Sequence, residues 1–439
     1  MTKWKKIKKY FFIYYFENKK FLIQTVPFRI IQLDESIKQK NINKIINGVS
    51  KKNNLVDPGT YYLPLFIGTT NCNFKCKYCY AYQGTYGNKG MNIERKVINK
   101  TIDYLKKKMQ KLSLKGNRKI IEFGLVFFGG ESLLNFNVLK YLVKTLKSVI
   151  HDLNKNNKTI FKPLVIINTN GSLFKGQILD FIKKNKDILE IVVSFDGLHH
   201  DKYRVLINNK PTSKIVIDGI RTIKKLGVKF AIGCCEPPDE ITNIDKNILY
   251  ITKLFGKKTE INLAFIRGAI PQVKTKAIYP GALEKRYTEK SLIIFGKKVA
   301  SLIKNGYTIF SKRFFNRIKE GGYIWRCPAA LYEFCIYPGG NVYPCHNFIS
   351  DKFKLGNILN KNFNPQKNQK IINKFKSRNI DKIACKNCIF QTICLSSFDC
   401  PSHSYYDLKN FYKVDYRTCA SAKIIMEALI EKFIKQINK

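Results

Sequence analysis

The 439-residue sequence contains no apolar stretch near the length of about 18 residues that suggests a membrane-spanning helix. It also lacks a secretory signal, because the opening MTKWKKIKKYFFIYYFENKK is basic and then aromatic, and its apolar run ends at Glu17 without a small-residue cleavage site. No internal repeat, low-complexity tract or nucleic-acid-binding motif is recognisable. We therefore expect a cytoplasmic protein, with no membrane segment and with nucleic acid not its expected partner.

Acidic residues are scarce: 31 Asp and Glu face 79 Lys and Arg, which gives a net charge of +48. The lysines are spread along the whole chain, and Asn, Ile, Tyr and Phe, whose codons are also rich in A and T, are abundant too. This pattern favours solvated lysine faces produced by genome composition. An acidic partner such as a peptide is the second interpretation, because a basic surface attracts anionic ligands.

Cysteine is the residue that the sequence has in excess, with 13 in all. In the cytosol, clustered cysteines indicate metal ligands rather than disulfides. Cys72, Cys76 and Cys79 follow the strand-like run YYLPLFIGTT at 61–70. A structural zinc site takes four ligands and a redox motif takes two thiols, whereas three thiolates can hold three corners of a cubane cluster and leave the fourth iron open.

The remaining pattern predicts an α/β fold. Strand-like apolar runs occur at 61–68, 120–129, 163–169, 189–195, 228–234 and 260–266, and helical patterns lie between them. This alternation predicts a partial (β/α)6 TIM-like barrel with reactive residues at the C-terminal ends of its strands. We divide the chain into a small N-terminal α+β unit of two strands and a short helix (1–58), the barrel core (59–275), a basic helical bridge (276–326) and a second cysteine-rich domain (327–439).

The CxxxCxxC loop, the β/α array and FFGGES at 127–132 together resemble the radical S-adenosylmethionine (SAM) enzymes. In that family, the open iron binds the methionine part of SAM. The resemblance implies that the SAM site contains Tyr78 near the adenine and Gly129, Gly130 and Glu131 at the methionine amino group. It places Asn170 at the same end of the barrel, Ser194 at the ribose or carboxylate, and Arg204 in an ion pair with the carboxylate. Other polar residues nearby receive no catalytic role: we expect His199 and His200 to pack in a loop, Asp196 to cap a helix or face the site, and Cys234 and Cys235 to lie in the core.

The C-terminal cysteines resemble the SPASM extension of peptide-modifying radical SAM enzymes. That resemblance implies one auxiliary cluster on Cys385, Cys388, Cys394 and Cys419, and another on Cys327, Cys345 and Cys400. The fourth ligand of the latter is either Cys335 or an open position. With the loop cluster, the expected cofactors are three [4Fe-4S] clusters and SAM. A zinc ribbon on Cys385 and Cys388 is the alternative for this region.

The resemblance is strongest to maturases that form thioether links in ribosomally made, Cys-containing peptides. The 5′-deoxyadenosyl radical would abstract a hydrogen from the peptide, and an external donor such as flavodoxin or ferredoxin would supply electrons. Residues 1–58 would be a shortened leader-peptide recognition domain. Sulfatase-activating relatives carry aspartate where this chain has His346, which argues against that activity. Carbon–carbon crosslinking, epimerisation, formylglycine formation, RNA modification and cluster-only electron transfer remain as alternatives.

Overall fold

A computed structural model provides the fold of the chain, and it describes residues 4–8, 10–25, 28–34, 36–50, 64–115, 120–155, 159–266, 287–319, 327–331, 333–378, 385, 388–395 and 400–437. The chain forms two compact units, each assembled from separate stretches of sequence. Unit 1 comprises Met1–Pro58, Thr288–Cys327 and Lys376–Lys439, and unit 2 comprises Gly59–Tyr287 and Pro328–Phe375. Within the described ranges, no helix combines the length and the apolar character that crossing a membrane requires.

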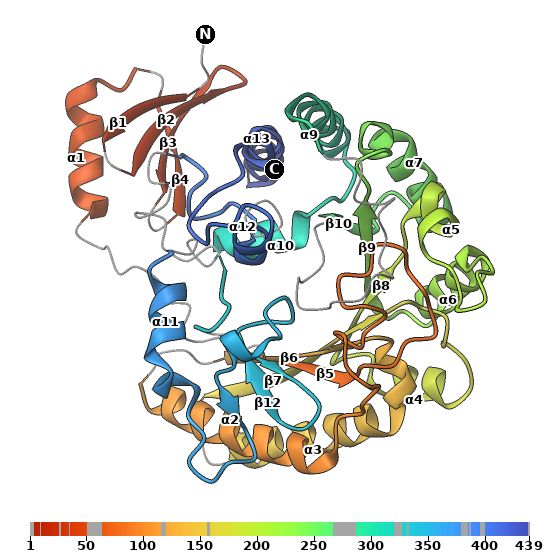
Figure 1. The fold of residues 1–439 in the computed structure, drawn as a ribbon. Coiled ribbons are helices and arrows are strands. Elements are labelled where there is room, and N and C mark those ends of the chain that lie inside the picture. The colour runs from red at the N-terminus through yellow and green to blue at the C-terminus, as the bar shows by residue number, and fades with distance from the viewer. Residues whose placement is uncertain are drawn as a thin grey trace. The chain divides into compact units, whose positions relative to one another are not determined.

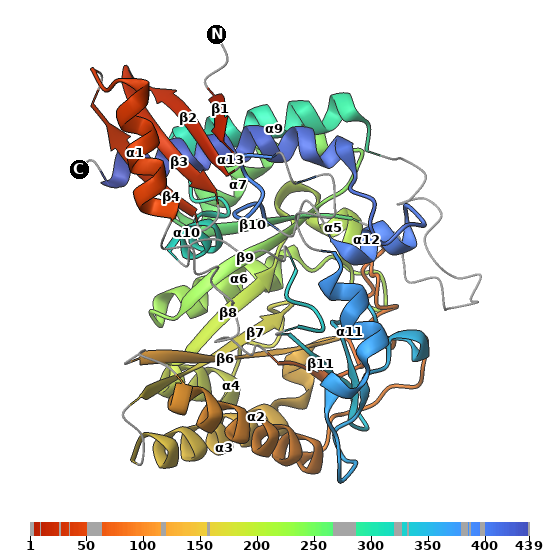
Figure 2. The ribbon, with the colours of Figure 1, turned by 90° about the vertical axis from the view of Figure 1, so that its left-hand side faces the viewer.

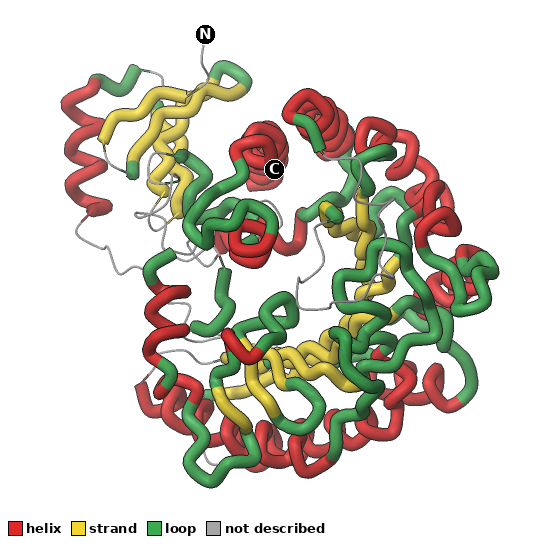
Figure 3. Tube along the Cα trace, in the orientation of Figure 1, coloured by secondary structure: helices red, strands yellow, loops and turns green. Residues whose placement is uncertain are grey.

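Unit 2 is built on parallel strands that follow one another in sequence order. They are β5 (Leu65–Thr69), β6 (Ile120–Gly129), β7 (Ile160–Thr169), β8 (Leu189–Ser194), β9 (Lys229–Glu236) and β10 (Glu260–Phe265). The helices that connect them are α2 (Arg95–Lys115), α3 (Phe136–Lys155), α4 (Gln177–Asn185), α5 (His200–Tyr203), α6 (Ser213–Lys225) and α7 (Ile244–Phe255). In Figures 1 and 3, these helices line the outer side of the strands. The predicted partial barrel is confirmed.

Apolar periodicity explains why these segments form the core. In α2, the side chains of Val97, Ile98, Ile102, Leu105 and Met109 are all buried, as their spacing on one helix face predicts. Figure 2 shows α2 beside α3, its helical neighbour. Every residue of β5 is buried, which is usual for a parallel strand covered on both faces.

The sheet of unit 2 extends beyond β5 with strands from much later in the chain. Its full order is β10-β9-β8-β7-β6-β5-β11-β12-β13, and the described strands therefore form an open sheet. The added strands are β11 (Cys335–Ile336), β12 (Asn341–Tyr343) and β13 (Gly356–Asn357), and α11 (Gln369–Lys376) follows them. β11 runs parallel to β5, with Cys335 opposite Leu65. The region of Cys335 and Cys345 is therefore joined to the strand that leads into the cysteine loop.

The N-terminal part of unit 1 is an antiparallel sheet in the order β1-β2-β3-β4, followed by one helix. Its elements are β1 (Trp4–Lys8), β2 (Phe11–Phe16), β3 (Lys19–Thr25), β4 (Phe28–Leu33) and α1 (Gln39–Ser50). The α+β character is confirmed, but the expectation of two strands is wrong. The run KFLIQTVPFRIIQL contains Pro27 and divides into β3 and β4, and WKKIK forms β1 although it is largely charged.

The later stretches of unit 1 supply its remaining helices, α9 (Glu289–Lys304), α10 (Ser311–Lys319), α12 (Pro401–Tyr406) and α13 (Tyr416–Ile437). The buried Tyr14 hydroxyl on β2 donates a 2.8 Å hydrogen bond to Glu431 Oε1 on α13. The Gln391 side chain donates to Thr25 Oγ1 at 2.9 Å. Through these contacts, the first and last stretches of the chain are joined within one compact unit.

Candidate functional site: the cysteine loop and the strand ends

The loop that carries Cys72, Cys76 and Cys79 follows β5 and is fixed by backbone hydrogen bonds on two sides. Lys75 N donates to Val205 O at 2.7 Å, and Lys77 N donates to Tyr203 O at 2.8 Å. On the other side, Glu131 N donates to Asn71 O at 2.8 Å. The sheet register pairs Thr69 with Gly129 and so brings the loop to the end of β6. The loop is therefore held between segments that follow β6 and β8.

Close backbone contact explains the two glycines that follow β6. A Cβ atom on Gly130 would lie 2.2 Å from Asn71 O, and one on Gly129 would lie 2.2 Å from Thr69 O. Both distances are too short for any side chain, so a larger residue would displace the cysteine loop. The glycines thus position the loop, in addition to the SAM contact that the sequence predicts for them.

The three loop thiols lie in an environment that disfavours a free thiolate. Burial raises the pKa of Cys72 to about 12, and burial also raises the pKa of Cys76 and Cys79 above the ordinary cysteine value. Two backbone N–H groups already point at sulfur: Phe74 N lies 3.4 Å from Cys72 Sγ, and Gln83 N lies 3.2 Å from Cys79 Sγ. Such N–H donors stabilise ligated thiolates and tune cluster potentials. Three thiols in one fixed loop fit an iron–sulfur cluster.

Glu131 is buried, and its carboxylate accepts three hydrogen bonds from the protein. Oε1 accepts from Leu133 N at 3.0 Å and from Thr169 Oγ1 at 2.6 Å, and Oε2 accepts from Asn170 N at 2.6 Å. Burial raises the pKa of this carboxyl group, while these donors act in the opposite direction. Glu131 thus connects the ends of β6 and β7, and its position at the loop stays compatible with the predicted SAM contact.

Asn170 connects the end of β7 to the cysteine loop itself. Its Nδ2 donates to Asn73 Oδ1 at 2.8 Å, and its Oδ1 accepts from Ser172 N at 3.0 Å. Ser194 ends β8, half-buried, opposite Gly233 on β9. Both residues therefore lie at C-terminal strand ends, where the barrel pattern predicts reactive groups.

Arg204 forms a buried, two-point ion pair with Asp196. Arg204 Nε donates to Asp196 Oδ2 at 2.8 Å, and Nη2 donates to Oδ1 at 3.2 Å. The Tyr78 hydroxyl also donates to Asp196 Oδ2, Cys235 N donates to Oδ1 at 2.9 Å, and the guanidinium lies 5.3 Å from the centre of the Tyr78 ring. Although burial opposes it, the Arg204 charge holds the pKa of Asp196 below its usual value. Arg204 and Tyr78, both predicted site residues, therefore share one carboxylate.

Sequence reasoning left the role of Asp196 open between a helix cap and a site residue. Asp196 makes no side-chain capping hydrogen bond to the short 3-10 helix Gly197–His199. The signal that could have identified its role was the pairing of SFDG with an arginine eight positions later. His200 packs as expected, fully buried, with Nδ1 accepting from Asp196 N at 3.2 Å.

The β11–β12 region brings further residues to the cysteine loop within unit 2. The His346 ring lies 5.8 Å from the Tyr80 ring and 5.1 Å from the Phe128 ring. Burial lowers the pKa of His346 to about 4, so its imidazole is neutral. Cys345 precedes it, and Cys335 lies on β11; both are buried. Cys327 and Cys400 belong to unit 1. The auxiliary cluster expected on Cys327, Cys345 and Cys400 therefore stays a prediction from the sequence.

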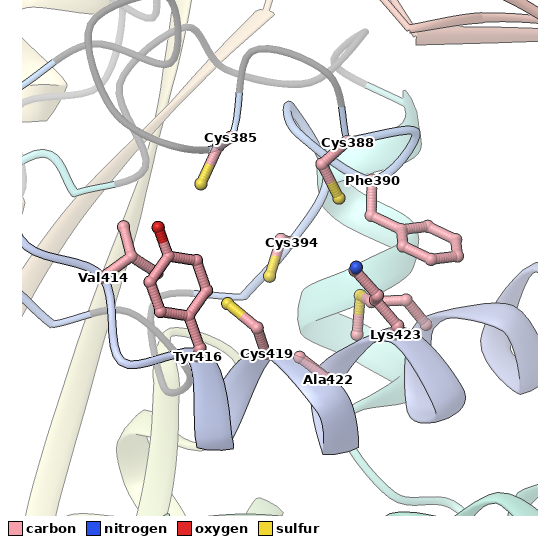
Figure 4. Close-up of a pocket in the computed structure, with 10 residues that line it drawn as sticks. Cys385, Cys388, Phe390, Cys394, Val414, Tyr416, Cys419, Ala422 and Lys423 are labelled. Carbon is pink, nitrogen blue, oxygen red and sulfur yellow. The ribbon is translucent and has the colours of Figure 1, made fainter. Parts of the chain in front are cut away.

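The other predicted auxiliary ligands meet around one cavity inside unit 1. A cavity of about 200 Å³ is lined by Cys385, Cys388, Phe390, Cys394, Val414, Tyr416, Cys419, Ala422, Lys423 and Met426. Figure 4 shows the sulfur atoms of the four cysteines directed toward a common space, with Cys419 projecting from α13. Four thiols around one cavity fit a [4Fe-4S] cluster, which takes four cysteine ligands.

Comparisons with known proteins agree with this geometry. Residues 66–238 match the Radical SAM superfamily, and residues 327–389 match SPASM, an iron-sulfur cluster-binding domain. The chain is 24% identical over 346 residues to a cysteine-type anaerobic sulfatase-maturating enzyme of Clostridium novyi (strain NT), covering 75% of this chain and 85% of that relative. The chain thus carries a radical SAM domain and a SPASM domain, and it is a radical SAM enzyme.

Two solved structures share its fold. Native anSMEcpe with bound AdoMet and Kp18Cys peptide superposes with a TM-score of 0.63 at 20% identity, covering 86% of this chain and 99% of that one. Streptococcus suis SuiB bound to precursor peptide SuiA superposes with a TM-score of 0.54 at 14% identity, covering 94% of this chain and 99% of that one. At these identities the likeness concerns the fold.

Proposed function

We propose that this enzyme is a peptide maturase that joins the sulfur of a substrate cysteine to a carbon of another residue in the same ribosomally made peptide. The observation that carries the proposal is the second group of four cysteines around one cavity of unit 1. An iron–sulfur cluster at such a site is a redox group separate in sequence from the cysteine loop. Net oxidation of a peptide requires an electron acceptor, and our candidate is the other predicted auxiliary cluster, on Cys327, Cys345 and Cys400. The cavity supports the proposal because this chain gathers four thiols there, as an auxiliary cluster requires.

Residues of the chain itself would hold the reactants. Cys72, Cys76 and Cys79 would ligate the cluster that, together with SAM, supplies hydrogen-atom abstraction. Asp196 holds the Nε and Nη2 edge of the Arg204 guanidinium. The remaining N–H groups of Arg204 would donate to the SAM carboxylate, since a guanidinium has five N–H donors. Gly129, Gly130, Glu131, Asn170, Ser194 and Tyr78 would complete the SAM site. An external flavodoxin or ferredoxin would deliver electrons in the cytoplasm.

The peptide itself would be recognised by the N-terminal sheet of unit 1. β4 pairs with β3 alone in the four-stranded sheet, so its other edge is where an extended peptide could add a strand. Arg29 lies on β4 itself, and Lys19 and Lys20 lie on the neighbouring β3. This positive charge would suit an acidic leader sequence. Both similar solved structures contain a bound peptide, Kp18Cys in anSMEcpe and SuiA in SuiB.

Formylglycine-type sulfatase maturation is the second candidate. It is favoured by the similarity to a sulfatase-maturating enzyme, which covers 85% of that relative. His346 supports the thioether proposal instead, because the family aspartate is replaced by a buried imidazole that stays neutral.

Anaerobic incubation with candidate peptides distinguishes the two reactions. A thioether removes two hydrogens per link and leaves the linked cysteine resistant to alkylation after reduction. Formylglycine formation at cysteine eliminates the sulfur and creates an aldehyde that hydrazide reagents label. Mass spectrometry of a Cys-rich peptide and of a sulfatase-derived peptide should give the first product only from the Cys-rich peptide. If every cysteine alkylates while the peptide changes elsewhere, the thioether proposal is wrong.

A further inference from the structure

A cluster of three ligand-type side chains lies near the C-terminal end of β9, apart from every cysteine assigned to an iron–sulfur cluster. It consists of His199, Cys234 and Glu236, whose Nε2, Sγ and carboxylate oxygen all lie within 4.8 Å of one another. Within the described ranges of the chain, it is the only group of His, Cys, Asp or Glu ligand atoms packed this closely. Cys234 and Glu236 project from β9, and His199 comes from the segment that follows β8.

One oxygen of this cluster is buried without a hydrogen-bond partner. Glu236 is fully buried, and its Oε1 accepts from Cys234 Sγ at 3.0 Å and from Asn247 Nδ2 at 2.9 Å. Its Oε2 has no partner and lies 3.9 Å from His199 Nε2. A buried polar atom left unsatisfied costs about 1–3 kcal/mol, and a bound ion beside it would remove this cost.

We propose that His199 Nε2, Cys234 Sγ and Glu236 Oε2 bind one Zn²⁺ ion. Thiolate and imidazole ligands favour zinc over Mg²⁺ and Ca²⁺, which prefer oxygen. The charges also balance, because one thiolate and one carboxylate neutralise the divalent ion in a buried site. Three protein ligands leave a fourth tetrahedral position for water or another oxygen.

Binding requires two small rearrangements within this cluster. His199 Nε2 lies 3.1 Å from Cys235 O, a contact in which the ring nitrogen donates, so its proton must move to Nδ1. Cys234 must give up its thiol proton, as cysteine ligands do on binding a metal. With Zn–N and Zn–S distances of about 2.0 and about 2.3 Å, the three ligand atoms must also approach one another by roughly 1 Å.

The test measures zinc in the full-length, cluster-reconstituted protein after gel filtration over a chelating resin. Elemental analysis should find about one zinc per chain. Cys234→Ser and Glu236→Gln should each lose it, whereas the matched variant Cys235→Ser, at the neighbouring thiol, should retain it. Equal melting temperatures of Glu236→Gln and the parent without zinc would show that the loss is not caused by misfolding.

Zinc X-ray absorption identifies the ligands, since zinc can also occupy cluster cysteines. The proposal predicts a first shell of one sulfur at about 2.3 Å and the rest nitrogen or oxygen near 2.0 Å. Replacement by Co²⁺ should give a thiolate-to-metal charge-transfer band that Cys234→Ser abolishes. A shell of three or four sulfurs, or zinc content unchanged in Cys234→Ser and Glu236→Gln, would overturn the proposal. So would a protein that holds no zinc after exposure to a stoichiometric amount.

Discussion

Arg204 and Asp196 meet through two hydrogen bonds, Nε to Oδ2 and Nη2 to Oδ1, with both side chains almost completely buried. Because the Tyr78 hydroxyl and the Cys235 amide donate to the same carboxylate, the aspartate is fully engaged and the guanidinium is fixed. A fixed guanidinium charge beside the cysteine loop is what recognition of a SAM carboxylate requires.

Arg204→Ala should weaken SAM binding without loss of iron. Losing one partner of a buried charge pair typically costs about 2–5 kcal/mol of binding, and leaving Asp196 buried without its cation costs about 3–5 kcal/mol of folding stability. Equilibrium dialysis with labelled SAM, together with iron analysis, measures the two effects. Asp196→Asn is the matched variant, because it keeps the shape and the arginine charge. It should bind SAM more tightly than Arg204→Ala, and unchanged SAM affinity in Arg204→Ala would show that Arg204 does not contact SAM.

Replacing Cys72, Cys76 and Cys79 together by alanine should remove about four of about twelve iron atoms and all SAM cleavage. The physical reason is that no other thiol of this loop remains to hold the cluster. Iron analysis after anaerobic reconstitution and chromatography for 5′-deoxyadenosine measure the result. A triple variant with full iron content or residual cleavage would contradict the assignment.

Replacing Cys388 and Cys394 by serine should remove a similar third of the iron while SAM cleavage persists. These thiols face the cavity of unit 1 and are not part of the loop after β5. Cys235→Ser serves as the control for thiol replacement, with iron content as its readout. If the double variant loses no iron but loses zinc, the zinc-ribbon alternative for this region is correct.

Stability should fall as the pH drops from about 6.5 toward about 4 because His200 is held neutral. Burial lowers its pKa to about 4, and Nδ1 faces the Asp196 N–H donor while Nε2 lies 3.0 Å from Thr212 Oγ1. As the pH falls, the unfolded state therefore takes up the proton before the native state does. The free energy of unfolding falls by about 2 kcal/mol between about pH 7 and about pH 5. Urea unfolding at both pH values measures this loss of stability. The loss should be smaller in His200→Gln, and an equal loss in parent and variant would contradict the neutral imidazole.

Cys400→Ala should reduce crosslink formation more than SAM cleavage. One carbon–sulfur bond removes two hydrogens from the peptide: one leaves as a hydrogen atom and the other as the thiol proton, and one electron remains to be accepted. Cys400 is a predicted ligand of the auxiliary cluster that would take up this electron. The ratio of crosslinked peptide to 5′-deoxyadenosine measures the coupling. A ratio equal to that of the parent would argue against Cys400 as a ligand that matters for the oxidation.

The sequence predicted the parts of the fold that depend on local periodicity. The six parallel strands and the buried face of α2 follow from apolar spacing, and both are confirmed. The strand count in residues 1–58 was wrong, because the charged run at β1 carries no clear alternation and the apolar run that contains β3 and β4 looks continuous in the sequence. Strand pairing between segments far apart, such as Cys335 opposite Leu65, has no local signal.

The residues of the candidate site likewise fall into those that the sequence predicted and those that only the structure revealed. The spacing of the cysteines along the sequence predicted which thiols of the loop and of the cavity belong together, because sets of metal ligands follow short-range sequence patterns. The Asp196–Arg204 pair and the cluster of His199 with Glu236 depend on which strand ends become neighbours, and only the folded chain determines that. Cys234 is fully buried, as its apolar surroundings suggest, but its hydrogen bond to Glu236 required the structure.

The assembly of unit 1 from the first and last stretches of the chain has a consequence for biosynthesis. The Tyr14 hydroxyl finds its partner 417 residues later, on Glu431. A nascent chain that has emerged only as far as β10 can already complete the parallel strands β5–β10 of unit 2. The N-terminal sheet can pack Phe11, Ile13 and Leu22 against α1 early, whereas the buried Tyr14 gains its partner on α13 only when the ribosome has nearly finished. During most of translation the sheet therefore lacks this later packing, a stage at which exposed apolar surface favours aggregation.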